Sequence, residues 1–241
     1  MLASTSTIER LDYARVPVMI HVSNEIEGGF RRKAVSKEPW TVQFIEGMEA
    51  EDVLFDLGAN VGSYALIAAA LGHRVVAFEC GAANYAALVN NCILNGMSER
   101  VLCICMAVGA ATELQWLNYR DLRAGAASHV LGRSAPGDKP IWFHRQPVLV
   151  SPLDKIVAEY RLPPATHIKL DVDGSESLVI KGAEQTIRGA KAVMLETKLE
   201  EEAQIVATMQ SFGFELVGRF DQRNGKPIGG IAYCHLVRRA A

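Results

Sequence analysis

The sequence predicts an α/β fold with a doubly wound, mostly parallel sheet of seven strands that ends in an antiparallel hairpin. Three observations predict it. Short apolar runs alternate with helical patterns from residue 52 onward, as expected of strands covered by helices on both faces. Glycines 72, 96 and 213 each stand just past a predicted helix end. The last two strand candidates are joined by a short loop rather than by a helix, which implies an antiparallel pair.

The predicted strands and helices alternate along the chain, so right-handed crossovers should place most strands parallel to one another. The predicted strands are Asp52–Asp56, Arg74–Glu79, Val101–Val108, His167–Asp171, Ala192–Glu196, Phe214–Arg219 and Ile231–Arg238. The predicted helices are Val61–Leu71, Asn84–Asn95, Ser151–Tyr160, Ser175–Arg188 and Glu200–Phe212. In the third of these helices we expect the Ser151 hydroxyl to cap the helix and Pro152 to occupy its first position.

A single domain of residues 1–241 is the simplest organisation, because no repeat, low-complexity tract or long linker divides the sequence. Residues 1–50 read as an N-terminal extension of mixed character. Residues 109–150 interrupt the alternation and hold two possible short strands, near Glu113–Tyr119 and Ile141–Val150. Because this insertion follows the third strand, we expect it to roof the site of the acceptor, that is, of the molecule on which the protein acts.

Composition narrows the classes of partner. The formal net charge is -2, so no global basic field attracts nucleic acid, and none is predicted as a partner. The five cysteines have no paired spacing, which favours free thiols in a reducing compartment. The N-terminus lacks a signal-peptide pattern, and the longest apolar stretch, near Ala65–Leu71, is too short to cross a bilayer. A cytoplasmic protein is expected, with a homodimer through the N-terminal segment or an edge strand as one option.

The turn after the first strand, Asp56 to Gly62 (DLGANVG), has the character of a cofactor site. Its glycines, 58 and 62, permit a tight turn and close approach of a ligand, but the dinucleotide pattern G-x-G-x-x-G is absent. An acidic residue, Asp56, precedes the glycines. A carboxylate there would repel a pyrophosphate but could accept hydrogen bonds from an amino-acid ammonium group. S-adenosylmethionine carries such a group and has no phosphate.

The second predicted strand ends at Glu79, about where a Rossmann unit places the acid that binds ribose hydroxyls. Met106 and Ala107, at the end of the third strand, would border an adenine, and plain core packing explains them equally well. The predicted cofactor-binding residues are Asp56, Gly58, Asn60, Gly62, Ser63, Glu79, Met106, Ala107 and Asp171.

Three segments together resemble a known family. DLGANVGSYALIAAALG, VVAFECGAANYAALVNN and HIKLDVDGSESLVIKGAEQTI are similar to the FkbM family of S-adenosylmethionine-dependent methyltransferases. The resemblance covers about residues 31–220, and its most specific part is Lys169–Gly174. It implies the class I methyltransferase, Rossmann-like fold and O-methylation of a sugar, glycan or natural-product hydroxyl. Cys80 stands where the family typically has proline after the ribose-binding acid.

Methyl transfer to oxygen needs a positioned acceptor and a group that removes its proton. Asp171 ends the fourth strand, at the sheet edge where ligands bind in such folds, and is the first candidate. His129, in the insertion, is a second candidate because an imidazole titrates near neutrality. Glu196, at the end of the fifth strand, could line the acceptor pocket or be a solvated strand end. Asp171 and Glu196 could share a magnesium ion, but nothing in their spacing requires it, and no metal is predicted.

Two other functions remain as alternatives. One is a methyltransferase-like domain that binds a cofactor or partner without catalysis, which the three strand-end acids Asp56, Glu79 and Asp171 oppose. The other is a nicotinamide-dependent oxidoreductase, which the missing glycine, the acid ahead of the turn and the terminal hairpin oppose.

Overall fold

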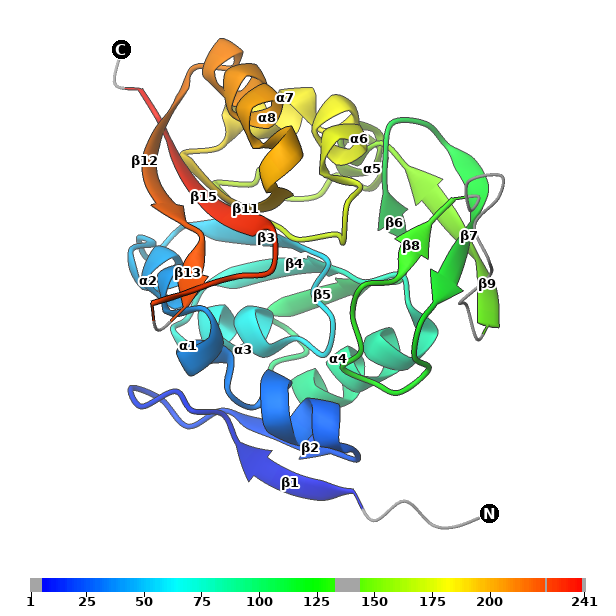
Figure 1. Cartoon of the computed structure of the whole chain (residues 1–241). Helices are drawn as coiled ribbons and strands as arrows, with labels where there is room; N and C mark the ends of the chain where they lie inside the picture. Colours follow the sequence, from blue (N-terminus) through cyan, green and yellow to red (C-terminus); the bar gives the residue numbers. More distant parts are fainter. Residues whose placement is uncertain (1–5, 133–143, 224, 240–241) are drawn as a thin grey trace.

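A seven-stranded sheet forms the centre of the molecule (Figure 1). The computed structural model describes residues 6–132, 144–223 and 225–239. From edge to edge, the strand order is β12-β15-β11-β10-β3-β4-β5. The strands are β3 Val53–Leu57, β4 Arg74–Phe78, β5 Val101–Ile104, β10 His167–Leu170, β11 Ala192–Lys198, β12 Phe214–Phe220 and β15 Ile231–Arg238. The predicted α/β fold with a mostly parallel sheet is confirmed.

The terminal hairpin explains the mixed edge of this sheet. β15 pairs antiparallel with β11 on one side and with β12 on the other. The chain leaves β11 through helix α8, Leu199–Ser211, and enters β12 two strand positions away, which leaves room for one strand between them. β15 then turns back into the space between them, so the last strand of the sequence is not the last strand of the sheet.

Helices cover both faces of the sheet (Figure 1). On one face α2 Pro39–Glu46, α3 Ser63–Ala70 and α4 Ala82–Leu94 share a hydrophobic cluster. On the other face α5 Leu153–Tyr160, α6 Glu176–Gly182, α7 Glu184–Gly189 and α8 share a second cluster. β3 contributes Leu54 to the first cluster and Phe55 to the second, because successive strand residues point to opposite faces.

The N-terminal residues are part of the first core rather than a separate unit. They form β1 Thr7–Arg10, β2 Met19–Val22, the short π-helix η1 Glu27–Arg31 and α1 Ala34–Lys37. Leu11 and Ile20 are buried in the first hydrophobic cluster. The side chains of Asn91 on α4 and of Asn95, its C-cap, accept hydrogen bonds from the backbone of β2, each at 2.8 Å. These contacts bring β2 against the helix that follows β4.

A second, four-stranded sheet comes from the 109–150 segment and its edges. Its order is β6-β9-β7-β8, with β6 Ala107–Val108, β7 Glu113–Tyr119, β8 Val130–Leu131 and β9 His144–Ser151. β7 coincides with a predicted strand. The other predicted strand, Ile141–Val150, begins in residues 141–143, which lie outside the described residues. Within the described ranges, no helix is long and apolar enough to cross a membrane.

Three local predictions were wrong. The predicted strand Val101–Val108 is two strands, because the chain turns at Met106 and Ala107–Val108 pair with β9 instead. The predicted helix Ser175–Arg188 breaks at Ala183, where φ is -125°. Next to this break, an added side chain on Gly182 would lie 2.0 Å from the Gly109 carbonyl oxygen. The break therefore lies where α6 meets the second sheet.

The third wrong prediction is the cap at Ser151. Ser151 ends β9 and pairs with Val108, and its hydroxyl lies 3.1 Å from that of Thr112. Pro152 occupies the N-cap of α5, and no side-chain hydrogen bond caps this helix. A residue already paired in a strand cannot also turn its hydroxyl onto the first helical amides. The remaining element ends differ from the predicted ones by a few residues.

Candidate active site

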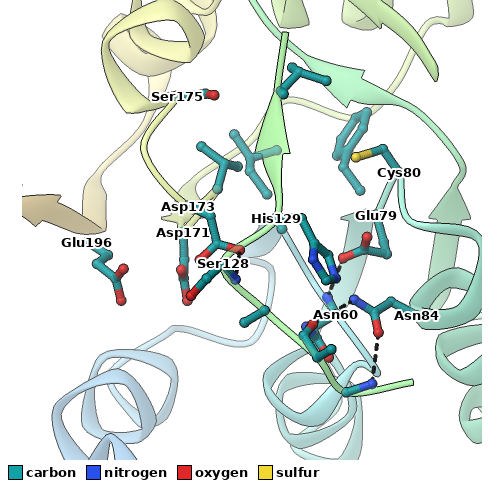
Figure 2. A pocket seen from close by; sticks show the side chains of 18 of the residues that line it. Asn60, Glu79, Cys80, Asn84, Ser128, His129, Asp171, Asp173, Ser175 and Glu196 are labelled. Atoms are coloured by element: carbon teal, nitrogen blue, oxygen red, sulfur yellow. Dashed lines mark hydrogen bonds between the residues drawn. The ribbon is translucent and has the colours of Figure 1, made fainter. Parts of the chain in front are cut away.

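A cavity of about 570 Å³ opens at the carboxyl ends of the central strands (Figure 2). Gly58 after β3, Glu79 after β4 and Asp171 after β10 line it, together with Glu196 of β11. Ligands in open α/β sheets bind outside this edge. The loop Gly125–His129 of the 109–150 insertion, here called the roof loop, lines the same cavity. That the insertion as a whole roofs the acceptor site stays a prediction.

The turn after β3 brings the backbone close to β10. Gly58 has φ 86°, and a Cβ atom there would lie 1.9 Å from the Asp171 carbonyl oxygen. Only glycine meets both requirements without strain. Asn60 also has a positive φ, 53°, and its side-chain amide donates to the Ala126 carbonyl at 2.8 Å. The turn is thus fixed against the roof loop on one side and against β10 on the other.

Glu79 is held at one end of the cavity by two backbone amides. Asn60 N donates to its Oε2 at 2.9 Å, and Gly81 N donates to its Oε1 at 2.7 Å. Burial raises the pKa of Glu79 to about 7, although these two amides favour its charged form. The carboxylate is therefore oriented before any ligand binds, and its remaining lone pairs can accept hydroxyl groups.

The roof loop is tied down by residues that the sequence analysis did not single out. Asn84, in the first turn of α4, accepts from Gly125 N at 2.8 Å and donates to Ala126 O at 3.1 Å. Ser128 N donates to Asp173 Oδ2 at 2.7 Å. A polar residue early in a helix is common on solvated faces, so sequence alone gave no signal for the role of Asn84.

Three carboxylates gather at the opposite end of the cavity. One oxygen each from Asp171, Asp173 and Glu196 lies within 4.8 Å of the others. Low-polarity surroundings and the neighbouring Asp171 charge raise the pKa of Asp173 to about 6 and that of Glu196 to about 8. Burial acts in the same direction on Asp171, but the Lys169 and Lys37 charges outweigh it and leave the pKa of Asp171 below its usual value. At neutral pH, Asp171 is therefore charged, Asp173 is mostly charged, and Glu196 is mostly protonated.

The close spacing of these three carboxylates could also suit a bound metal ion. Oxygen ligands this close together suit magnesium, but carboxylates also gather without one. Here the Lys169 ammonium already lies 3.2 Å from Asp171 Oδ2, where it supplies positive charge to the cluster. The absence of a metal therefore stays our prediction.

Asp56 lies behind the wall of the cavity rather than on it. Its side chain is fully buried and forms an ion pair with Lys169, with 3.4 Å between Asp56 Oδ1 and Lys169 Nζ. β3 continues one residue past Asp56, to Leu57, so Asp56 lies inside the strand. Its side chain points to the face of the sheet that α3 covers. The structure therefore does not bring this predicted cofactor ligand to the cavity.

His129 lies at the Glu79 end of the cavity in Figure 2, away from Asp171. Its ring packs on Tyr119, with 4.7 Å between ring centroids, and burial lowers its pKa. Among the described residues, its Nδ1 atom has no hydrogen-bond partner. The structure thus brings one of the two predicted bases, Asp171, to the acidic end and places the other elsewhere.

Of the remaining predicted cofactor-binding residues, some line the cavity and others do not. Met106 and Ala107 line the cavity. Gly62 does not; it precedes α3 with φ 91°, and a Cβ atom there would lie 2.5 Å from Leu88 Cδ1. Ser63 borders a small adjoining pocket, and its hydroxyl donates to the Arg31 carbonyl at 3.0 Å.

Comparison with known proteins shows the family. Residues 56–216 match the model of the methyltransferase FkbM domain. A 61-residue stretch is 41% identical to a tRNA (guanine(37)-N(1))-methyltransferase of Anopheles gambiae and makes up 25% of this chain. That stretch corresponds to 11% of the mosquito enzyme, so only a small part of the enzyme is matched.

Solved structures share the fold at low sequence identity. The methyltransferase FkbM from Methylobacillus flagellatus superposes with a TM-score of 0.53 and 18% identity, over 78% of this chain and 44% of that one. TYW2 of P. horikoshii, solved in complex with MeSAdo, has a TM-score of 0.51 and 11% identity, over 97% and 70% of the two chains. The fold is therefore the Rossmann-like fold of class I methyltransferases, as the sequence predicted.

Proposed function

This chain belongs to the FkbM methyltransferase domain family and uses S-adenosylmethionine, and we propose that its acceptor is a hydroxyl of a sugar, a glycan or a natural product. One observation supports oxygen as the target. A charged carboxylate, Asp171, lies at the end of the cavity opposite Glu79, where a proton acceptor for a hydroxyl is needed.

The residues at the Glu79 end fit the cofactor. Glu79 presents a preoriented carboxylate to the ribose hydroxyls, and Gly58 and Asn60 border the same space. Met106 and Ala107 would border the adenine. S-adenosylmethionine supplies a methyl group that is activated by its sulfonium charge, because the neutral thioether is a good leaving group.

Asp171 would act on the acceptor. The Asp171 carboxylate would take the hydroxyl proton as the acceptor oxygen receives the methyl group from the sulfonium, and the products would be a methyl ether and S-adenosylhomocysteine. A general base of this kind contributes about 10²–10⁴-fold to the rate. Glu196, with its pKa near 8, is protonated at neutral pH and can donate a hydrogen bond to a second acceptor oxygen.

The acidic end of the cavity disfavours a nucleic-acid acceptor. The charged carboxylates of Asp171 and Asp173 would repel a phosphate backbone, and the net charge of -2 gives no compensating field. The mosquito enzyme that shares a 61-residue stretch is named for a tRNA base. That stretch is only a quarter of this chain, so it gives no support for the same acceptor here.

The first experiment is calorimetric titration with S-adenosylhomocysteine, with NAD as the matched control. Heat from the former and none from the latter is expected. Methyl transfer is then assayed with glycosides, hydroxylated natural products and unmodified tRNA, and S-adenosylhomocysteine release is measured. An O-methyl product identified by mass spectrometry and NMR is expected from a hydroxylated acceptor. Methylation of tRNA alone, or of nitrogen alone, would contradict the proposal.

A further inference from the structure

We propose that Lys169 is a positioning residue that holds the Asp171 carboxylate charged and oriented at the acceptor end of the cavity. The proposal rests on the function proposed above, since it concerns the group assigned there as base. Lys169 does not line the large cavity; it borders the small adjoining pocket. It would therefore act on the reaction through Asp171 rather than on the acceptor itself.

The strand geometry brings the two side chains together. Lys169 and Asp171 are two residues apart on and just after β10, so their side chains leave the backbone on the same side. Lys169 Nζ donates to Asp171 Oδ2 at 3.2 Å. The Lys169 side chain is 3% exposed, and its Nζ lies 5.2 Å from the centre of the Tyr64 ring. A cation this deeply buried requires a counter-charge.

A competing explanation is that Lys169 only neutralises Asp56. The two residues are paired across β10 and β3, with 3.4 Å between the charged atoms. However, among the described residues neither Asp56 oxygen accepts a hydrogen bond, whereas Asp171 does accept one from Lys169. Burial also raises the pKa of Asp56, which weakens it as a counter-ion. The lysine is therefore directed more toward Asp171 than toward Asp56.

Other charged groups around Asp171 would set its protonation state if Lys169 were absent. Lys37 and Arg31, from the N-terminal helices, are positive and contribute less than Lys169. Acidic groups from several elements interact with Asp171: Asp56 on β3, Tyr64 on α3, Asp173 and Glu176 after β10, Glu196 on β11 and Tyr233 on β15. Without Lys169, these groups and the burial of Asp171 would favour its protonated, inactive form.

The test separates the two roles of Lys169. Lys169→Met alone would leave Asp56 buried without its partner and could unfold the protein. The double variant Asp56→Asn/Lys169→Met removes both charges and is compared with Asp56→Asn, which keeps the lysine. The Asp171 carboxyl is followed by NMR in protein labelled with ¹³C at the aspartate side-chain carboxyl, and its signal is identified by its loss in Asp171→Asn.

We expect the Asp171 pKa to be at least one unit higher in the double variant than in Asp56→Asn. Turnover at neutral pH should fall about tenfold or more, with S-adenosylhomocysteine affinity retained. Asp56→Asn/Lys169→Arg should restore the titration, because a guanidinium keeps the positive charge. Equal Asp171 titrations in the double variant and in Asp56→Asn would overturn the inference. This readout needs no acceptor, so failure to methylate any hydroxyl would count against the proposed function and not against the role of Lys169.

Discussion

At the scale of single residues, Asp171 and Glu79 serve opposite ends of one cavity and should respond differently to substitution. Asp171→Asn removes the proton acceptor and keeps the size of the side chain. We expect turnover to fall by about 10²–10⁴-fold while S-adenosylhomocysteine still binds. Steady-state kinetics and calorimetry on the same preparation measure the two effects. Loss of binding together with turnover would instead make Asp171 a cofactor ligand.

The raised pKa of Glu196 predicts that the stability of the folded protein depends on pH. Its pKa is raised from 4.5 to about 8 in the folded protein, by burial and then by the Asp171 charge. The folded state therefore retains a proton that the unfolded state releases, and the resulting stability is present below pH 4.5 and lost as pH rises through 8. Urea unfolding of the wild-type protein and Glu196→Gln, from pH 5 to 9, isolates this contribution. The wild-type protein should lose stability relative to the variant as pH rises, and parallel pH curves would contradict the assignment.

The acidic cluster also predicts the response to chelation. Because Lys169 already supplies positive charge beside Asp171, methyl transfer should be unchanged after dialysis against EDTA. Added Mg²⁺ should not raise the rate. Loss of activity on chelation, restored by Mg²⁺, would show that the three carboxylates hold a metal after all.

Some residue assignments could be made from sequence and others could not. Glu79 and Asp171 follow buried strands directly, so their positions at the carboxyl edge were predictable. Asp56 was assigned to the same edge, but β3 extends through Leu57. Asp56 therefore lies inside the strand rather than at its end, beside Lys169 of β10, and its side chain forms an ion pair with Lys169 instead of reaching the cavity. Strand ends are rarely predictable to a single residue, yet that precision decides which way a side chain points.

At the scale of elements, the turn after β3 depends on glycine for a second reason beyond its backbone conformation. Gly58 and Gly72 both have positive φ, but only at Gly58 would a Cβ atom meet another atom, the Asp171 carbonyl at 1.9 Å. Gly72→Ala should therefore lose about 1–2 kcal/mol of stability through backbone strain alone. Gly58→Ala should lose more than about 3 kcal/mol and also impair S-adenosylhomocysteine binding. Denaturant unfolding and calorimetry compare the pair, and equal losses would remove the role given to the β3–β10 contact.

The elements that were predicted wrongly share a physical cause. The 101–108 run is apolar throughout, so nothing local marks its break, and in the 175–188 run, which is helical in pattern, Gly182 is a local sign of one. The structure breaks the first because Ala107–Val108 pair with β9, more than 40 residues later. It breaks the second at Ala183, beside the contact between Gly182 and Gly109. Both breaks lie where the main sheet meets the second sheet, and long-range contacts of this kind leave no trace in local periodicity.

At the scale of the whole molecule, the alternating strands and the terminal hairpin were enough to predict the central sheet. They did not show how residues 1–50 join it. Leu11 and Ile20 share a core with α3, and β2 is hydrogen-bonded to Asn91 of α4 and to Asn95, the C-cap of α4. These contacts pack the N-terminal segment against the helix that follows the Glu79 strand, and the single domain stays a prediction.

A single domain predicts one cooperative unfolding transition, and the cofactor product should shift all of it. S-adenosylhomocysteine present at 100 times its dissociation constant should stabilise the fold by about 2.7 kcal/mol. Differential scanning calorimetry should show one transition that moves to higher temperature as a whole. The variant Leu11→Ala, far from the cavity in sequence but inside the shared core, should lower the same transition, since buried leucine truncations lose about 2–5 kcal/mol. Two transitions, of which only one responds to ligand and the other to Leu11→Ala, would mean that the N-terminal segment folds separately and that its contacts with α4 do not couple it to the cofactor site.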